Sequence, residues 1–157
     1  IIVDIFAPRA ESGYWGDMTR TFIKGEPSDA QRKLVGAVKL AQERVIKSLG
    51  EGVKAGEIHQ GVQEFFASKG YKTQKRKSGY VGFFHGTGHQ LGLECHDLGE
   101  HSLGFKLGGA PLRAGEVYTV EPGLYYPEIG GCRIEDNGVV TPTGFKLLSS
   151  LDYDWVK

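Results

Sequence analysis

The chain has 157 residues, which is enough for one domain with its own hydrophobic core. Lysine plus arginine and aspartate plus glutamate number 19 each, so no net charge recruits nucleic acid or an acidic membrane surface. No apolar run approaches the roughly 20 residues of a membrane span. Because there are only two cysteines and no charged leader, we expect a cytoplasmic location, with Cys95 and Cys132 as small core residues.

The chain begins with a pattern typical of two strands. Residues 1–6 are apolar apart from Asp4 and are predicted to form a buried strand. Residues 14–23 are predicted to form a second strand, with Asp17 near its start. The two strands are expected to pair as a hairpin with a long connection.

Two helices are predicted next. Ser28 and Gln31 form a capping box at the start of the first helix, which ends before Gly50. Its core-facing stripe is predicted to consist of Leu34, Val38, Ala41, Val45 and Leu49. The second helix is predicted over residues 56–69 and ends at Gly70.

The second half is predicted to consist of strands and loops. The basic run 72–77 lacks interleaved aromatic residues and is predicted to be a solvated loop instead of a nucleic-acid site. Residues 80–84 lead into a histidine-rich segment, and strands are predicted at 116–120 and 133–140, with a turn at 122–123. Because no linker divides the chain, the expected architecture is a single domain of mixed helices and strands.

Histidines gather in one glycine-rich segment, where His85, His89 and His96 are three of the five in the chain. Histidine is a common metal ligand and changes charge near neutral pH, so the segment predicts a metal site or acid–base chemistry. The other two are predicted to have no function. His59 is expected to be a solvated helix residue, and His101 lies in a glycine-rich loop.

Four carboxylates lie in apolar or β-branched surroundings, namely Asp4, Asp17, Glu121 and Glu135. Each alone could be a surface charge or half of an ion pair. Their convergence without cations would cost several kcal/mol per ion, whereas two divalent ions would balance the four charges. Oxygen donors with one imidazole favour Mn, Co or Zn, and paired ions of this kind activate a shared water.

Five motifs occur in a fixed order along the chain. They are Asp-Met-Thr-Arg-Thr-Phe at 17–22, His-Gly-Thr-Gly-His at 85–89, His96, Thr-Val-Glu-Pro-Gly-Leu-Tyr at 119–125 and Arg-Ile-Glu-Asp-Asn-Gly at 133–138. In these motifs the chain resembles the pita-bread metallopeptidase family, which includes methionine aminopeptidase, Xaa-Pro aminopeptidase and prolidase. The resemblance implies an α+β pita-bread fold in an incomplete, C-terminal form. Residues 1–157 would then be a catalytic domain that lacks its N-terminal helices and strands.

The resemblance also implies metal-binding roles for matching residues. Asp4 would chelate one metal ion, Asp17 and Glu135 would bridge both ions, and His89 and Glu121 would hold the other. Glu121 would also be the general base for the attacking water.

Further roles concern the substrate. His96 would hydrogen-bond the substrate carbonyl and stabilise the oxyanion, while Arg133 would support the site or the substrate. His85 and the Arg-Ile-Glu-Asp motif are typical of the proline-specific branch, in which His85 would act in catalysis and line a proline pocket. Tyr125 would belong to the same pocket.

The expected activity is therefore two-metal-dependent cleavage of a peptide bond before proline, in Xaa-Pro peptides or dipeptides, with manganese as the favoured ion. An aminopeptidase with another preference, such as methionine, and a non-catalytic peptide- or protein-binding module remain alternatives. Because missing elements would leave one face of the sheet uncovered, we expect a homodimer or association with a missing N-terminal portion.

Overall fold

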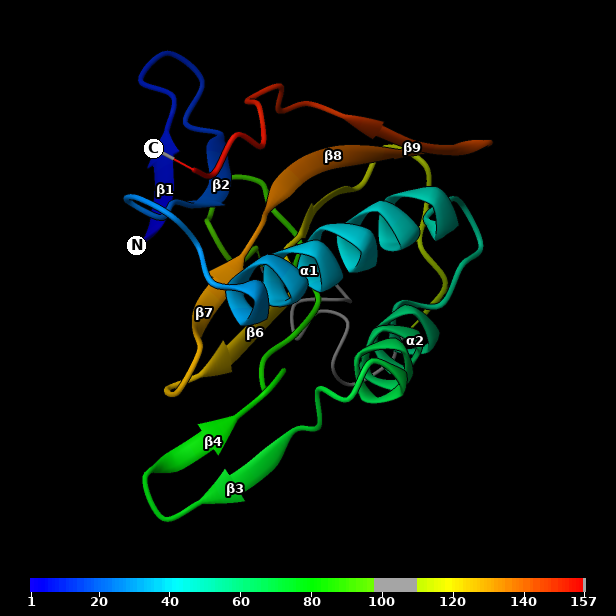
Figure 1. Ribbon diagram of the computed structural model, residues 1–157. Helices are drawn as coiled ribbons and strands as arrows, with labels where there is room; N and C mark the ends of the chain where they lie inside the picture. Colours follow the sequence, from blue (N-terminus) through cyan, green and yellow to red (C-terminus); the bar gives the residue numbers. More distant parts are fainter. Residues whose placement is uncertain (98–109, 157) are drawn as a thin grey trace.

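A long helix, α1 (Asp29–Ser48), lies across the strands and supplies much of the core (Figure 1). The structure, a computed structural model, describes residues 1–97 and 110–156. The predicted capping box is confirmed, because the Gln31 N–H donates to Ser28 Oγ and the Ser28 N–H donates to Gln31 Oε1. All five predicted stripe residues are buried, so the amphipathic pattern identified the core-facing side of this helix.

The second helix, α2 (Ala55–Ser68), packs beside α1. Gly70 follows it with a positive φ of 87°, a conformation that glycine adopts without strain. On its buried face, Phe66 packs edge-on against Phe83 with ring centroids 5.5 Å apart. Neither helix in the described chain has the length and apolar character needed to cross a bilayer.

The first two strands, β1 (Ile2–Pro8) and β2 (Trp15–Thr21), form the predicted antiparallel hairpin. Asp4 pairs with Thr19, and Phe6 pairs with Asp17. The prediction that the first strand is buried is wrong. Most of β1 is exposed, Ile5 to 58%, because no described element covers its outer side.

The basic run is also more ordered than predicted. It contains β3 (Gln74–Arg76), which pairs with β4 (Gly79–Val81) as an exposed antiparallel hairpin. Arg76 reaches Glu128 across the surface at 2.9 Å. The segment is solvated, as predicted, but it is a strand and not a loop.

A three-stranded antiparallel sheet has the order β5-β8-β9. Its members are β5 (Val117–Val120), β8 (Asp136–Thr141) and β9 (Gly144–Leu147). The strand predicted at 116–120 is thus confirmed to within one residue. Helix α1 contacts β5 and β9, which closes the core on this side.

A separate antiparallel pair consists of β6 (Gly123–Tyr126) and β7 (Gly130–Arg133). Gly123, predicted to lie in a turn, is therefore the first residue of a strand. The single strand predicted over 133–140 is also wrong, since the chain leaves β7 after Arg133 and enters β8 at Asp136. Hydrogen bonds to β2 stabilise the break, where the Glu135 N–H donates to the Thr19 carbonyl at 3.0 Å.

A buried ion pair connects β2 to the start of β8, next to the break between β7 and β8. Arg20 Nη2 donates to Asp136 Oδ1 at 2.8 Å, and both side chains are almost fully buried. Arg20 Nη1 donates to the Glu135 carbonyl, while Gln42 of α1 donates to Asp136 Oδ2. Buried charges with complete partners hold a defined geometry, so this network fixes β2 and the Glu135 backbone relative to α1.

Candidate metal centre

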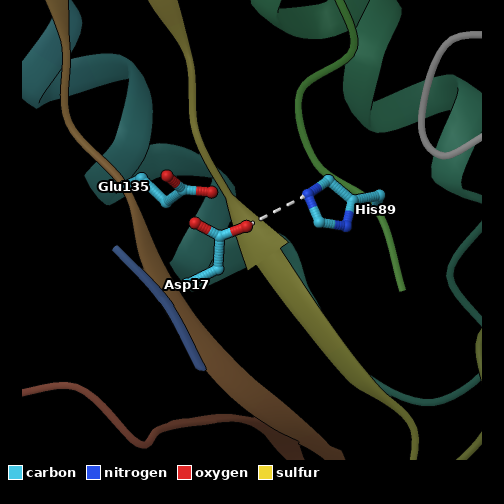
Figure 2. A group of neighbouring side chains, drawn as sticks. All are labelled: Asp17, His89 and Glu135. Carbon is cyan, nitrogen blue, oxygen red and sulfur yellow. Dashed lines mark ion pairs between the residues drawn. The ribbon is translucent and has the colours of Figure 1, made fainter. Parts of the chain in front are cut away.

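Three side chains from distant parts of the sequence meet in one buried cluster (Figure 2). Asp17 comes from β2, Glu135 from the break between β7 and β8, and His89 from the glycine-rich segment. One ligand atom from each lies within 4.8 Å of the others. All three residues are buried, with at most 9% of their surface exposed. We refer to Asp17, His89 and Glu135 as the central cluster.

The other two predicted ligands lie at the edges of this cluster. Glu121 follows β5, and its Oε1 lies 3.5 Å from His89 Nε2. Asp4 is exposed on β1, where its Oδ2 accepts a hydrogen bond from Arg133 Nη2. Asp4 also acts electrostatically on Asp17. The fold therefore brings all five predicted ligand residues to one region, with Asp4 and Glu121 outside the tightest group among the described residues.

The orientation of the His89 ring suits a cation. Its Nδ1 lies 3.0 Å from the Gln90 carbonyl, and because a carbonyl only accepts, this nitrogen carries the hydrogen. The Nε2 lone pair of the neutral ring then faces Asp17 Oδ2 at 3.6 Å and Glu121 Oε1 at 3.5 Å. Burial lowers the pKa of His89, which favours this neutral form. A lone pair directed at two carboxylate oxygens is the arrangement that a bound metal ion stabilises.

The close approach of buried carboxylates makes their charged forms less stable. Burial raises the pKa of Glu135 to about 9 and that of Glu121 to about 7, and repulsion by neighbouring carboxylates adds to both shifts. Burial likewise raises the pKa of Asp17, whose buried Oδ1 has no hydrogen-bond partner among the described residues. The donor set of oxygens and one imidazole fits Mn, Co or Zn, so the residues present are suited to a divalent ion.

A series of hydrogen bonds connects the central cluster to the residues predicted to bind the substrate. Thr19 Oγ1 donates to Glu135 Oε2 at 2.5 Å and accepts from Arg133 Nε at 3.0 Å. Arg133 Nη1 donates to the Tyr125 hydroxyl, which lies 2.8 Å from His85 Nε2. Arg133 therefore contacts Asp4, Thr19 and Tyr125 at once, and any movement of it would disturb both the ligands and the pocket.

His85 is held as a neutral ring. Its Nδ1 lies 2.7 Å from the Gly86 carbonyl and must donate, so Nε2 accepts from the Tyr125 hydroxyl. Burial lowers the pKa of His85 to about 4. Phe84 and Tyr125 pack beside it, with ring centroids 6.2 and 5.4 Å from that of His85. These rings form an apolar wall next to Glu121.

The third histidine of the segment, His96, also lies at the cluster. Its ring centroid is 4.1 Å from that of His89, with the planes inclined by 40°. The side chain is exposed, so its polar atoms can reach a bound molecule. The structure thus brings together every residue that the sequence assigned to the site.

Two predictions about neighbouring residues are wrong. Cys95 is only partly buried, and its thiol donates to Asp17 Oδ2 at 3.3 Å, because the segment after Gly92 bends instead of alternating like a strand. His59 is 94% buried and not solvated, since the Thr87 hydroxyl lies 2.9 Å from its Nδ1. The expectation for Cys132 as a core residue is confirmed. His101 lies outside the described residues.

Threonines in the site were not predicted. Thr19, Thr87 and Thr119 are fully buried, and each hydrogen-bonds a residue of the site or its backbone. Thr19 could have been found from the sequence, because it lies two positions after Asp17 on a strand and therefore on the same face. The periodicity of the sequence gives no such signal for Thr87.

Comparison with known proteins agrees with this geometry. Residues 1–142 match the model of metallopeptidase family M24. The chain belongs to metallopeptidase family M24. It is 32% identical over 152 residues to the Xaa-Pro dipeptidase of Pyrococcus furiosus, an alignment that covers 97% of this chain and 40% of that protein.

Solved structures of similar proteins have the same fold. The prolidase from Pyrococcus horikoshii OT3 has a TM-score of 0.84 at 32% identity, covering 98% of this chain and 41% of that one. The X-Pro aminopeptidase from Thermotoga maritima MSB8 also has a TM-score of 0.84 at 32% identity, covering 99% and 40%. The predicted pita-bread fold is confirmed, and the chain spans about 40% of the length of these M24 relatives.

Proposed function

We propose that this M24 chain carries the catalytic centre of a two-metal exopeptidase that hydrolyses the bond between an N-terminal residue and proline. The observation that carries the proposal is the central cluster, in which the His89 lone pair faces carboxylate oxygens in a buried site. The similarity to proteins named Xaa-Pro dipeptidase supports the proline preference. Residues 1–157 would form part of a single catalytic domain.

The proposed ligands are Asp4, Asp17, His89, Glu121 and Glu135. Four carboxylates with one imidazole balance two divalent ions, and manganese suits a site dominated by oxygen. Bound ions would supply positive charge that polarises the scissile carbonyl and lowers the pKa of water.

The remaining steps belong to side chains of this chain. Glu121 accepts a proton from the attacking water, whose oxygen bonds to the carbonyl carbon. His96 donates a hydrogen bond to the oxygen that becomes negative. The carbon–nitrogen bond then breaks, and the proton held by Glu121 passes to the proline nitrogen that leaves. Burial raises the pKa of Glu121 to about 7, which supports its proposed role as the proton acceptor.

The pocket beside His85 is the proposed site for the proline ring. Phe84 and His85 line a cavity here, and Tyr125 packs against both rings. A pyrrolidine ring would bury apolar surface against them. Arg133 holds Tyr125 through a hydrogen bond to its hydroxyl. We further propose that the exposed side of β1 is covered by a second copy or by another portion of the protein, and that the protein acts in a reducing compartment because both cysteines are free.

The direct test is hydrolysis by the intact parent protein that contains this chain, purified and loaded with Mn²⁺. Release of proline from Ala-Pro, or of the first residue from Ala-Pro-Gly, should occur with Mn²⁺, stop with a chelator and be absent in Glu121→Gln. Met-Ala-Gly serves as the matched peptide without proline. Faster cleavage of Met-Ala-Gly would favour the methionine-type alternative. An intact parent protein that binds Mn²⁺ but cleaves none of these peptides would contradict the proposal and favour a peptide-binding module.

A further inference from the structure

His59 is a buried polar side chain that the proposed mechanism does not use. It lies on the apolar face of α2, one turn after Ala55 and three residues before Val62, and is 6% exposed. Burying an imidazole is unfavourable unless its polar atoms are paired. Here Nδ1 lies 2.9 Å from Thr87 Oγ1, and the ring packs against Phe83 with centroids 5.2 Å apart.

Thr87 is the middle residue of the 85–89 segment and is fully buried. Its carbonyl accepts a hydrogen bond from the Glu121 N–H at 2.7 Å. Two residues further on, the His89 carbonyl accepts from the Thr119 N–H at 2.9 Å, and the His89 N–H donates to Thr119 Oγ1 at 3.0 Å. Thr87 therefore connects His59 on one side with the backbone of Glu121 on the other.

The same imidazole also supports the other end of the segment. Phe83, which packs on His59, meets His85 edge-on with ring centroids 5.1 Å apart. Helix α2 thus contacts the segment through a hydrogen bond at Thr87 and through the Phe83 ring, which packs on both His59 and His85. These contacts limit both rotation and sliding of the segment relative to Glu121.

We propose that His59 is a positioning residue, which acts through Thr87 to hold His85, His89 and Glu121 in the geometry that hydrolysis requires. The proposal deepens the proposed peptidase function and rests on it for its kinetic consequence. Its structural consequence, order at the Glu121 amide, does not depend on any activity. Small displacements of reacting groups reduce rates strongly, by up to about a hundredfold for 1 Å.

Two pairs of substitutions separate the hydrogen bond from packing. His59→Leu and Thr87→Val fill similar volumes without the bond. His59→Asn keeps a polar atom at the position of Nδ1, and Thr87→Ser keeps the hydroxyl. Gln60→Leu is the matched control, because Gln60 neighbours His59 on α2 but is exposed, and its side chain donates to Glu64.

The first measurement is hydrogen exchange of backbone amides in the metal-free full chain. In His59→Leu and Thr87→Val, we expect the Glu121 and Thr119 amides to exchange at least tenfold faster than in the wild type. The Val140 amide, bonded to the Glu116 carbonyl at 2.8 Å, should not change. Unchanged exchange at Glu121, or an equal increase at Val140, would overturn the proposal, because the bond would then be dispensable or only stabilise the whole fold.

The second measurement is the kinetics of Ala-Pro hydrolysis by the Mn²⁺-loaded variants. We expect kcat to fall roughly tenfold to a hundredfold in His59→Leu and Thr87→Val, with KM changed less than about twofold. His59→Asn and Thr87→Ser should recover most of kcat, and Gln60→Leu should match the wild type. A change in KM with kcat unaltered would overturn the proposal, and so would a kcat of His59→Asn as low as that of His59→Leu. If the wild type cleaves no peptide, the proposed function fails, and the exchange data alone decide the role of His59.

Discussion

The Nε2 atom of His89 lies 3.6 Å from Asp17 Oδ2, although the two residues come from segments far apart in the sequence. The His89 ring is oriented by the Gln90 carbonyl, so the separation is set by the backbone and not by a direct hydrogen bond. A gap of this size between two acceptors is suited to a cation.

The first prediction concerns removal of one charge from the central cluster. Asp17→Asn keeps the shape but lowers the negative charge, so Mn²⁺ affinity should fall at least a hundredfold. Asn137→Ala is the control. Asn137 contacts the backbone of Asp17, because its Nδ2 donates to the Asp17 carbonyl and not to the Asp17 side chain. It should weaken Mn²⁺ binding less than tenfold. Calorimetric titration of both metal-free variants measures this, and equal losses would contradict the assignment.

The second prediction is that metal binding strengthens the fold more as pH rises. Glu121 and Glu135 have pKa values raised to about 7 and about 9, above their ordinary 4.5. The folded metal-free chain therefore holds protons that the unfolded chain has lost, and it loses stability between pH 6.5 and 9. A divalent ion replaces these protons.

Thermal unfolding with and without Mn²⁺ tests this linkage. The Tm of the metal-free chain should fall over this range, while the gain in Tm on adding Mn²⁺ should grow by several degrees. The window begins at pH 6.5 because the lowered pKa values of His85 and His89 give the opposite slope below it. A gain in Tm that shrinks as pH rises would contradict the assignment of these carboxylates as ligands.

The third prediction concerns Arg133, whose guanidinium contacts three residues. Lysine keeps the charge but cannot reach Asp4, Thr19 and Tyr125 together. We expect Arg133→Lys to lower kcat/KM for Ala-Pro by roughly tenfold or more. Arg9→Lys is the matched control, because Arg9 forms an exposed pair with Glu11 and should leave kcat/KM unchanged. An Arg133→Lys enzyme with full activity would remove this residue from the site.

The fourth prediction compares two glycines. Gly82, just before the histidine segment, has a φ of +92°, and an added Cβ would lie 2.7 Å from Thr73 Cα. Gly82→Ala should lower the free energy of unfolding by about 2–4 kcal/mol. Gly36 lies in α1 with open space around it, so Gly36→Ala should raise the free energy by about 0.5–1 kcal/mol. Urea unfolding measures both, and similar effects would contradict the backbone geometry described at Gly82.

Local signals made much of the fold predictable. The capping box at Ser28 and the apolar stripe of α1 are properties of neighbouring residues, and both are confirmed. The break at Glu135 was missed because it depends on hydrogen bonds to β2, a distant segment. The exposure of β1 was missed because an apolar strand pattern does not show whether another element covers it.

The residues of the candidate site could be predicted from sequence motifs, whereas the residues that hold them in place could not. Asp17, His89 and Glu135 were found from their spacing and order, and the structure brings them together. Their roles as ligands remain predictions. The polar neighbours of His59 in the sequence predict an exposed side chain. Its spacing from Ala55 and Val62, however, places it on the buried face of α2. Helical periodicity, weighed above neighbour polarity, would have identified it.

The most direct test of the metal centre is anomalous diffraction from crystals of the Mn²⁺-soaked protein. We expect two peaks, both within coordination distance of Asp17 and Glu135, with one also bound by His89 Nε2 and Glu121 and the other by Asp4. No peak in the central cluster at saturating Mn²⁺, with the side chains arranged as described, would contradict the proposed two-metal centre.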